Sequence, residues 1–165
     1  MSAIGIAILA VVTLQRLFEL WLSNRNTRQL LAAGAVEHAP GHYPLIVAVH
    51  ALWLACLWLL APGRPINLLF LALFAIAQGA RLWVLRTLGP RWTTRIIVLP
   101  GKPLVAKGPY RIVNHPNYLI VVSEIALLPL AFGLWWVAVV FSLLNAAVLA
   151  IRIAKENAAL RNLRA

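Results

Sequence analysis

Five long apolar stretches, separated by short polar segments, constrain the fold of this chain most. Each has close to the ~20 residues that a helix needs to cross ~30 Å of hydrocarbon. The stretches cover residues 3–22, 44–60, 66–88, 117–132 and 134–153. We therefore predict an all-α integral membrane protein with five transmembrane helices. The fourth stretch is the shortest and carries Pro129, so we expect it to kink or to span only part of the bilayer.

The composition excludes the common soluble classes. Hydrophobic residues make up 62% of the chain and charged residues 12%, whereas a soluble domain is nearer half and a quarter. A net charge of +11 on a soluble protein would suggest nucleic acid as a partner. Here the basic residues cluster at one predicted membrane face, so we expect attraction to anionic membrane lipids and no nucleic-acid partner.

The distribution of basic residues predicts the orientation. With the N-terminus outside, thirteen of the fifteen Lys and Arg residues fall on the cytoplasmic side. The exceptions are Arg64, on the outside, and Arg16, within the first span. The positive-inside rule therefore favours an N-out, C-in topology. The N-terminus lacks a basic segment before its apolar run, so we expect the first helix to be retained as an uncleaved anchor.

Little of the chain is left for a domain outside the membrane. We predict a single membrane-embedded domain, 1–165, with a three-helix N-terminal part, 1–88. The longest polar segment, 89–116, is expected to form a cytoplasmic cap, with a small hairpin or irregular turn around Pro100-Gly101. The very short connection at Phe132-Gly133 predicts a tight antiparallel hairpin of the last two helices. The chain has one cysteine, which excludes a disulfide within the chain, and we expect no metal ion.

Ionisable residues inside the spans are costly and are therefore candidates for function. Arg16 and Glu19 are three residues apart on one helix face, which favours a mutually satisfied pair. We expect Arg81 to extend toward the cytoplasmic surface. Glu124 has no cation three or four positions away, so it must be neutral, paired with another helix, or facing a polar cavity. The sequence favours a functional and a structural role for Glu124 equally.

The densest polar constellation is the segment 107–118, which combines tyrosines, a histidine and prolines at one membrane boundary. An interfacial aromatic belt followed by a turn would account for it equally well. On the last helix, Asn145, Arg152 and Glu156 are spaced to share one face. Arg152 and Glu156 are also four residues apart, which alone is usually a weak surface pair.

These residues resemble a known family. The segment GPYRIVNHPNY (108–118), followed by Glu124 and by RIAKENAAL (152–160), is similar to the isoprenylcysteine carboxyl methyltransferase family. The resemblance covers roughly residues 88–163. It implies an integral-membrane methyltransferase that uses S-adenosylmethionine (AdoMet) and whose second part, 89–165, binds the cofactor. The segments QRLFELWLSNRN and GHYPLIVAVH further resemble a bacterial branch associated with type III polyketide synthases, which implies a bacterial cytoplasmic membrane and a polyketide-pathway partner.

The resemblance also implies roles for individual residues. Glu156 matches a glutamate that holds the cofactor, and Arg152 an arginine near the substrate. The remaining cofactor positions match Lys102, Pro103, Leu104, Val105, Tyr110, His115, Pro116, Asn117 and Tyr118. We predict Arg152 and Glu124 as catalytic residues; Glu124, His115 and Glu156 are the candidates for a base if the acceptor needs one.

Two positions depart from the family pattern. Asn114 stands where the family usually has Arg before His-Pro, and Asn157 stands where it usually has a second Glu. The loss of a cation at Asn114 disfavours a prenylcysteine carboxylate and favours an acidic enol or phenol, such as that of an alkylpyrone. We expect AdoMet to enter from the cytoplasm, between the segment 102–118 and the last helix. The lipophilic acceptor would enter sideways from the bilayer.

Two alternatives remain. Sterol reductases have a similar C-terminal half and bind NADPH at the corresponding loop, so the chain could be an NADPH-dependent membrane enzyme. A small transporter is the other, with Glu124 and Arg81 lining its path. The chain has no internal repeat to support an inverted-repeat transporter, and a transporter leaves the aromatic loop unexplained.

Overall fold

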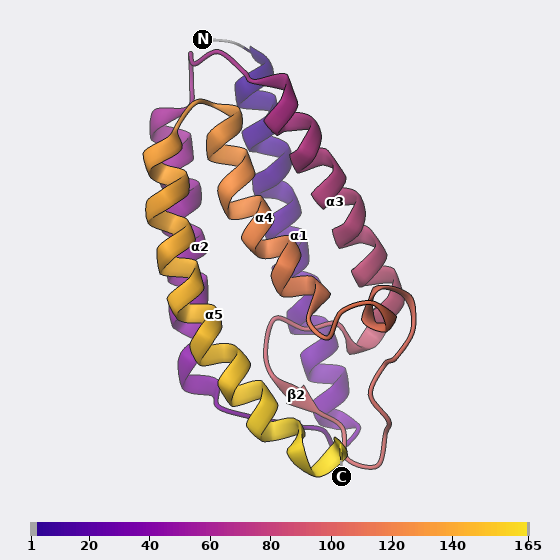
Figure 1. Cartoon of the computed structure of the whole chain (residues 1–165). Coiled ribbons are helices and arrows are strands. Elements are labelled where there is room, and N and C mark those ends of the chain that lie inside the picture. Colours follow the sequence, from indigo (N-terminus) through magenta and orange to yellow (C-terminus); the bar gives the residue numbers. More distant parts are fainter. Residues whose placement is uncertain (1–2, 165) are drawn as a thin grey trace.

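The computed structural model describes the backbone of residues 3–164 and the side chains of residues 3–160. Five helices run along a common direction: α1 (Ala3–Ala32), α2 (Tyr43–Leu60), α3 (Leu68–Leu88), α4 (Pro116–Ala131) and α5 (Trp135–Arg164). Figure 1 shows the N-terminus at one end of this bundle and the C-terminus at the other, as an odd number of spans predicts. The segment between α3 and α4 lies at the C-terminal end.

Four of these helices are long and apolar enough to cross a membrane. Their outer faces carry exposed large apolar side chains, such as Leu14 on α1, Ile76 on α3 and Leu143 on α5. Helices that are apolar on all sides suit a lipid environment. The fifth, α4, has 16 residues, or about 24 Å, with Pro129 inside it. The count of five complete spans and the N-out orientation therefore stay predictions.

Two helix boundaries differ from the expectation. The first helix continues to Ala32, ten residues beyond the predicted 3–22. The last continues to Arg164, eleven residues beyond the predicted 134–153. In both helices the added turns are polar, and they extend past the apolar core toward the segment 89–115. Hydropathy therefore locates the apolar part of each helix and not the residue at which the helix ends.

The predicted tight hairpin between the last two helices is confirmed. Gly133 adopts a positive φ of 67°, which glycine tolerates because it has no Cβ. The Leu134 amide donates to the Pro129 carbonyl at 2.9 Å, closing the turn. Below it, a buried core joins α1, α2, α4 and α5 around side chains such as Leu9, Trp53 and Leu128.

The polar cap, defined here as residues 89–115, is mostly irregular, with short 3₁₀ turns at Gly89–Arg91 (η2) and Gly108–Arg111 (η3). The predicted hairpin between residues 95–99 and 103–106 is wrong. Strand β2 (Ile97–Val98) instead pairs antiparallel with β1 (Val36–Glu37), in the connection between α1 and α2. The strand finds its partner across the bundle because α1 extends far enough to deliver the 36–37 backbone to it. The alternative expectation, an irregular cap, describes the segment 99–107.

Side chains of the extended first helix hold the cap in place. Asn26 Nδ2 donates to the Trp92 carbonyl at 2.8 Å. Ser23 Oγ hydrogen-bonds the Thr94 hydroxyl at 2.7 Å and accepts from the Thr94 amide at 2.8 Å. A 3₁₀ helix (η1, Pro40–His42) leads into α2 beside them. These bonds satisfy buried polar groups of irregular backbone, which would otherwise be costly.

Candidate functional site

A cavity of about 560 Å³ lies between the polar cap and the end of α5. It brings together ten of the residues predicted from the sequence, although they are spread over more than fifty positions. They are Lys102, Pro103, Leu104, Val105, Tyr110, His115, Asn117, Tyr118, Arg152 and Glu156. Pro116 begins α4 next to them, where a proline is tolerated because the first helical amide has no partner within the helix. The volume falls in the range of sites for drug-sized ligands.

The Tyr118 hydroxyl joins the two predicted residues of α5. Arg152 Nε donates to this hydroxyl at 2.7 Å, and the hydroxyl in turn donates to a carboxylate oxygen of Glu156. The Arg152 guanidinium also lies 5.3 Å from the centre of the Tyr118 ring and donates to the Thr94 carbonyl at 2.5 Å. The predicted pairing of Arg152 with Glu156 therefore runs through Tyr118. This arrangement fixes both charged groups at the cavity wall.

Aromatic groups from the cap and from α4 line the same wall. The rings of His115 and Tyr118 stack, with centroids 5.2 Å apart and planes 13° from parallel. His115 Nδ1 lies 3.9 Å from a carboxylate oxygen of Glu156. Burial, together with the negative charge of Glu156, raises the pKa of the Tyr110 phenol to about 12. Tyr110 is therefore a neutral hydrogen-bonding group at physiological pH.

Glycine at position 108 lets the cap approach α3 closely. Its φ is +58°, and a Cβ at this position would meet the Thr87 hydroxyl at 2.6 Å. The turn that follows carries Tyr110 toward the cavity. Elsewhere in the cap, Arg91 Nη1 donates to the Pro103 carbonyl at 2.8 Å. This bond holds the irregular segment 102–105 in place.

A second cavity, of about 260 Å³, adjoins the first within the helical bundle. Four residues line both cavities: Trp92, Asn117, Tyr118 and Arg152. Most other walls of the second cavity are apolar, with side chains from α1, α2, α4 and α5, although the charged Arg16, Glu19 and Arg81 also line it. Its exposed lining residues are Leu17 and Leu20 of α1 and Val47 and Ala51 of α2, so it reaches the outer surface between these two helices.

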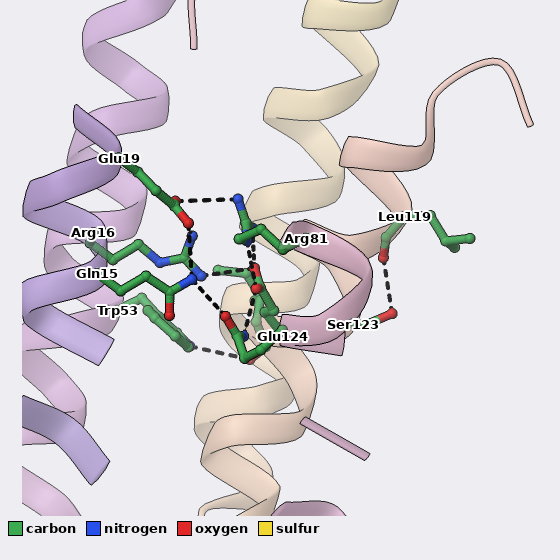
Figure 2. A network of polar contacts seen from close by, with 10 residues as sticks. Gln15, Arg16, Glu19, Trp53, Arg81, Leu119, Ser123 and Glu124 are labelled. Atoms are coloured by element: carbon green, nitrogen blue, oxygen red, sulfur yellow. Dashed lines mark hydrogen bonds and ion pairs between the residues drawn. The ribbon is translucent and has the colours of Figure 1, made fainter. Parts of the chain in front are cut away.

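Glu124, in contrast, is engaged by other side chains (Figure 2). One of its oxygens accepts from Gln78 Nε2 and Arg81 Nε, both at 2.7 Å. The other accepts from Arg16 Nη2 at 2.8 Å and from Arg81 Nη2. Glu124 is 1% exposed and does not line either of the two cavities. Of the three sequence-based alternatives for Glu124, the structure supports pairing with other helices; its catalytic role stays a prediction that the geometry does not support.

Glu19 completes this charge network, defined here as Gln15, Arg16, Glu19, Gln78, Arg81 and Glu124. Glu19 accepts from Arg16 Nη1 at 2.8 Å, which confirms the predicted pair, and from Arg81 Nη1 at 3.3 Å. The expectation that Arg81 extends to the cytoplasmic surface is wrong, because this residue is 3% exposed. Two carboxylates within hydrogen-bonding distance hold its guanidinium inside, where two acidic and two basic groups balance in charge.

Sequence reasoning missed two residues at the junction of the cavities. Trp92 is 2% exposed and lines both cavities, and its Nε1 has no hydrogen-bond partner among the described residues. Thr94 accepts from Arg152 through its carbonyl. The sequence signal that could have found them is the polar segment after residue 22, in which Ser23 and Asn26 are three residues apart and so share one helix face. These two residues are the ones that hold Thr94 and Trp92.

Comparisons with known proteins agree with this layout. The sequence profile of the isoprenylcysteine carboxyl methyltransferase (ICMT) family matches residues 68–162, from α3 to the end of α5. An uncharacterized protein of Bacillus subtilis, YpbQ, is 36% identical over 159 residues, covering 93% of this chain and 95% of that protein. An uncharacterized protein of Haemophilus influenzae is 27% identical over 157 residues, covering 90% of each. No solved structure matches the chain significantly.

Proposed function

The chain belongs to the isoprenylcysteine carboxyl methyltransferase family, and from this premise we propose that it is a membrane O-methyltransferase. It would transfer the methyl group of AdoMet to an acidic oxygen of a lipophilic acceptor. One observation carries the proposal: a cavity lined by charged and aromatic groups meets an apolar cavity at Tyr118 and Arg152. A polar methyl donor and a lipid acceptor need two such sites with a common boundary.

The donor set of the larger cavity suits AdoMet. Glu156 offers a carboxylate for an ammonium group, and Arg91 and Lys102 offer cations for a carboxylate. The flat faces of Tyr110 and His115 suit an adenine ring. Asn117 Oδ1, which has no hydrogen-bond partner among the described residues, could accept a hydrogen bond from the ligand. When bound, AdoMet supplies an activated methyl group, so the protein has to contribute position and environment.

Arg152 is the residue that we assign to the acceptor oxygen. It lines both cavities, and its position is fixed by Tyr118 and Thr94. A cation held at this boundary would attract an acceptor that is already ionised, such as an enolate, phenolate or carboxylate. Such an acceptor needs no strong base, which agrees with the engagement of Glu124 elsewhere. Fixed alignment of the two partners can contribute about 7–11 kcal/mol to lowering a barrier.

The two cavities also suggest how each partner arrives. The larger cavity lies at the end of the bundle that carries most basic residues, which would face the cytoplasm of a bacterial inner membrane. The apolar cavity reaches the surface between α1 and α2, where a lipid could enter sideways. Asn114, which lines the larger cavity in place of a cation, favours an enol or phenol of a polyketide-type lipid over a prenylcysteine carboxylate.

The direct test is methyl transfer by the purified protein in detergent. The protein is incubated with methyl-labelled AdoMet and, separately, a prenylcysteine analogue, an alkylpyrone and a long-chain phenol. We expect label in the organic phase with at least one of these, and more with the pyrone or phenol. Consumption of NADPH with a sterol substrate, together with no transfer of label, would overturn the proposal in favour of a reductase.

A further inference from the structure

We propose that the apolar cavity contains a second polar subsite, formed by His50 and Asn145, that binds a hydroxyl group on the tail of the acceptor. This inference deepens the proposed function, because it takes the apolar cavity as the acceptor site and adds a specificity determinant to it. Nothing in the methyl transfer itself requires these two residues. They therefore need a separate explanation.

Asn145 is a buried amide with an unused donor. It lies on α5 in the middle of an apolar run and is 2% exposed. Its Nδ2 has no hydrogen-bond partner among the described residues, although it lines the apolar cavity. An unpaired buried amide destabilises the protein, because its donor has lost water without gaining another acceptor. The cost is removed if a ligand in the cavity accepts this hydrogen bond.

His50 offers the complementary group from α2. Its Nδ1 lies 2.9 Å from the Ile46 carbonyl, which can only accept, so Nδ1 carries the hydrogen. In the neutral ring Nε2 is then an acceptor. His50 also lines the apolar cavity. The cavity wall thus has an acceptor on α2 as well as a donor on α5.

The two groups lie at the same depth. Tyr43 of α2 and Arg152 of α5 both hydrogen-bond Thr94, at 3.2 and 2.5 Å, so the ends of these two side chains meet at one residue, which we take as a common reference level. The helices run antiparallel and pack together (Figure 1). His50 and Asn145 are each seven residues deeper, or about 10 Å from that level.

This separation distinguishes the subsite from the reacting centre. The methyl group must be transferred near Arg152, where the cavities join, and a group about 10 Å deeper reaches the tail of the acceptor. A hydroxyl can accept from Asn145 and donate to His50 at once, whereas a carbonyl or a hydrocarbon satisfies one of them or neither. The nearby walls include the apolar side chains of Ile46, Trp53 and Val148. The charged Arg16, Glu19 and Arg81 also line this cavity, but they are engaged with one another and with Glu124 in the charge network. The preferred acceptor is therefore a lipid with one oxygen function within an otherwise hydrocarbon tail.

The test compares the binding of two probes to the detergent-solubilised protein without AdoMet. One is para-dodecylphenol, and the other is the same phenol with a tail hydroxyl about 10 Å from the phenol oxygen. Dissociation constants are measured for the wild type, Asn145→Leu and His50→Phe. The control variant is Val148→Ala, which alters an apolar wall of the same cavity.

We expect the wild type to bind the hydroxylated probe about tenfold more tightly than the plain one, for two neutral hydrogen bonds. Asn145→Leu and His50→Phe should abolish this preference but still bind the plain probe. Binding of the plain probe also shows that these variants fold. Val148→Ala should weaken the binding of both probes and leave the ratio of their dissociation constants unchanged. Equal binding of the two probes by the wild type, or an unchanged ratio in Asn145→Leu, would overturn the subsite. Because the ratio is measured without AdoMet, an absence of methyl transfer with the preference intact would refute the proposed function alone.

Discussion

Arginine and glutamate side chains meet at two places in this molecule, and the two places differ in how their polar groups are satisfied. In the charge network, Glu19 and Glu124 receive all of their hydrogen bonds from protein side chains on α1 and α3. At the larger cavity, Arg152 and Glu156 share the Tyr118 hydroxyl and line the wall beside Trp92 Nε1 and Asn117 Oδ1, which have no hydrogen-bond partner within the described part of the chain. The same residue types thus form a buried charge network in one place and line a candidate ligand site in the other.

The comparison teaches that an ionisable residue within a membrane span is a poor guide to function by itself. Glu124 is the deepest and most conspicuous carboxylate in the sequence, yet its partners are all within the protein. Glu156 lies in a less conspicuous position on the polar extension of α5, and it lines the cavity. What separates them is whether the surrounding protein leaves hydrogen-bonding capacity for a ligand.

The largest effect that we predict concerns stability. Glu124→Ala leaves Arg81 buried with one carboxylate instead of two, so we expect a loss of about 3–5 kcal/mol in the free energy of unfolding. Thermal or denaturant unfolding in detergent measures it. Ser123→Ala is the matched control, because its hydroxyl bonds to the Leu119 carbonyl of its own helix. A Glu124→Ala variant as stable as the control would show that the network is not structural.

The next effect concerns turnover. Arg152→Ala should lower the rate of methyl transfer by about 100-fold, because it removes the cation assigned to the acceptor oxygen. AdoMet affinity should change only a few-fold, since Glu156 and the cap remain. Initial rates and direct binding of labelled AdoMet separate the two quantities. If Arg152→Ala instead bound AdoMet much more weakly but kept its turnover at saturating AdoMet, the roles of Arg152 and Glu156 would be reversed.

A smaller effect is expected at the hydroxyl that joins the two residues. Tyr118→Phe keeps the ring that stacks on His115 and removes the bridge between Arg152 and Glu156. We expect turnover about tenfold lower, which corresponds to about 1.4 kcal/mol, with folding preserved. Rates at saturating AdoMet give the result, and unchanged rates would show that the bridge does not position Arg152.

The smallest effect is a pH dependence at Tyr110. Its pKa in the folded protein is raised to about 12, above the ordinary value of about 10 in an unfolded chain. The contribution of Tyr110 to stability is therefore complete below about pH 10 and is lost as the pH rises toward 12. The tyrosine absorbance of the wild type minus that of Tyr110→Phe follows this titration. A midpoint near pH 10 in the folded protein would contradict the buried environment described here.

Much of the fold follows from hydropathy. The apolar stretches locate all five helices, and the Phe132-Gly133 connection predicts the hairpin, because length and burial in lipid leave a chain few alternatives. The polar turns that extend α1 to Ala32 escaped prediction because hydropathy gives no signal for a helix that continues beyond its apolar stretch. For α5, the spacing of Arg152 and Glu156 already placed Glu156 on the last helix, and only the end of this helix at Arg164 was not predicted. The pairing of Val36–Glu37 with Ile97–Val98 also escaped prediction, since two-residue strands have no pattern of their own.

The site divides in a similar way. Eleven cofactor and substrate positions between Lys102 and Glu156 could be selected from the sequence by family resemblance, and the fold brings ten of them to one cavity. The apolar cavity, the position of Trp92 at the junction of the two cavities and the burial of Arg81 in the charge network could not be predicted. They depend on which helix faces are adjacent, and one chain without spatial information does not specify this.

The most direct test of the central claim is the binding of labelled AdoMet to the detergent-solubilised protein, with Glu156→Gln and Lys155→Ala compared to the wild type. Lys155 is the exposed neighbour of Glu156 on the same helix turn and serves as the matched control. The account predicts saturable binding to the wild type and to Lys155→Ala, and about 100-fold weaker binding to Glu156→Gln, a loss within the range expected for a hydrogen bond to a charged group. Unchanged affinity in Glu156→Gln, or no binding to a folded wild type, would contradict it.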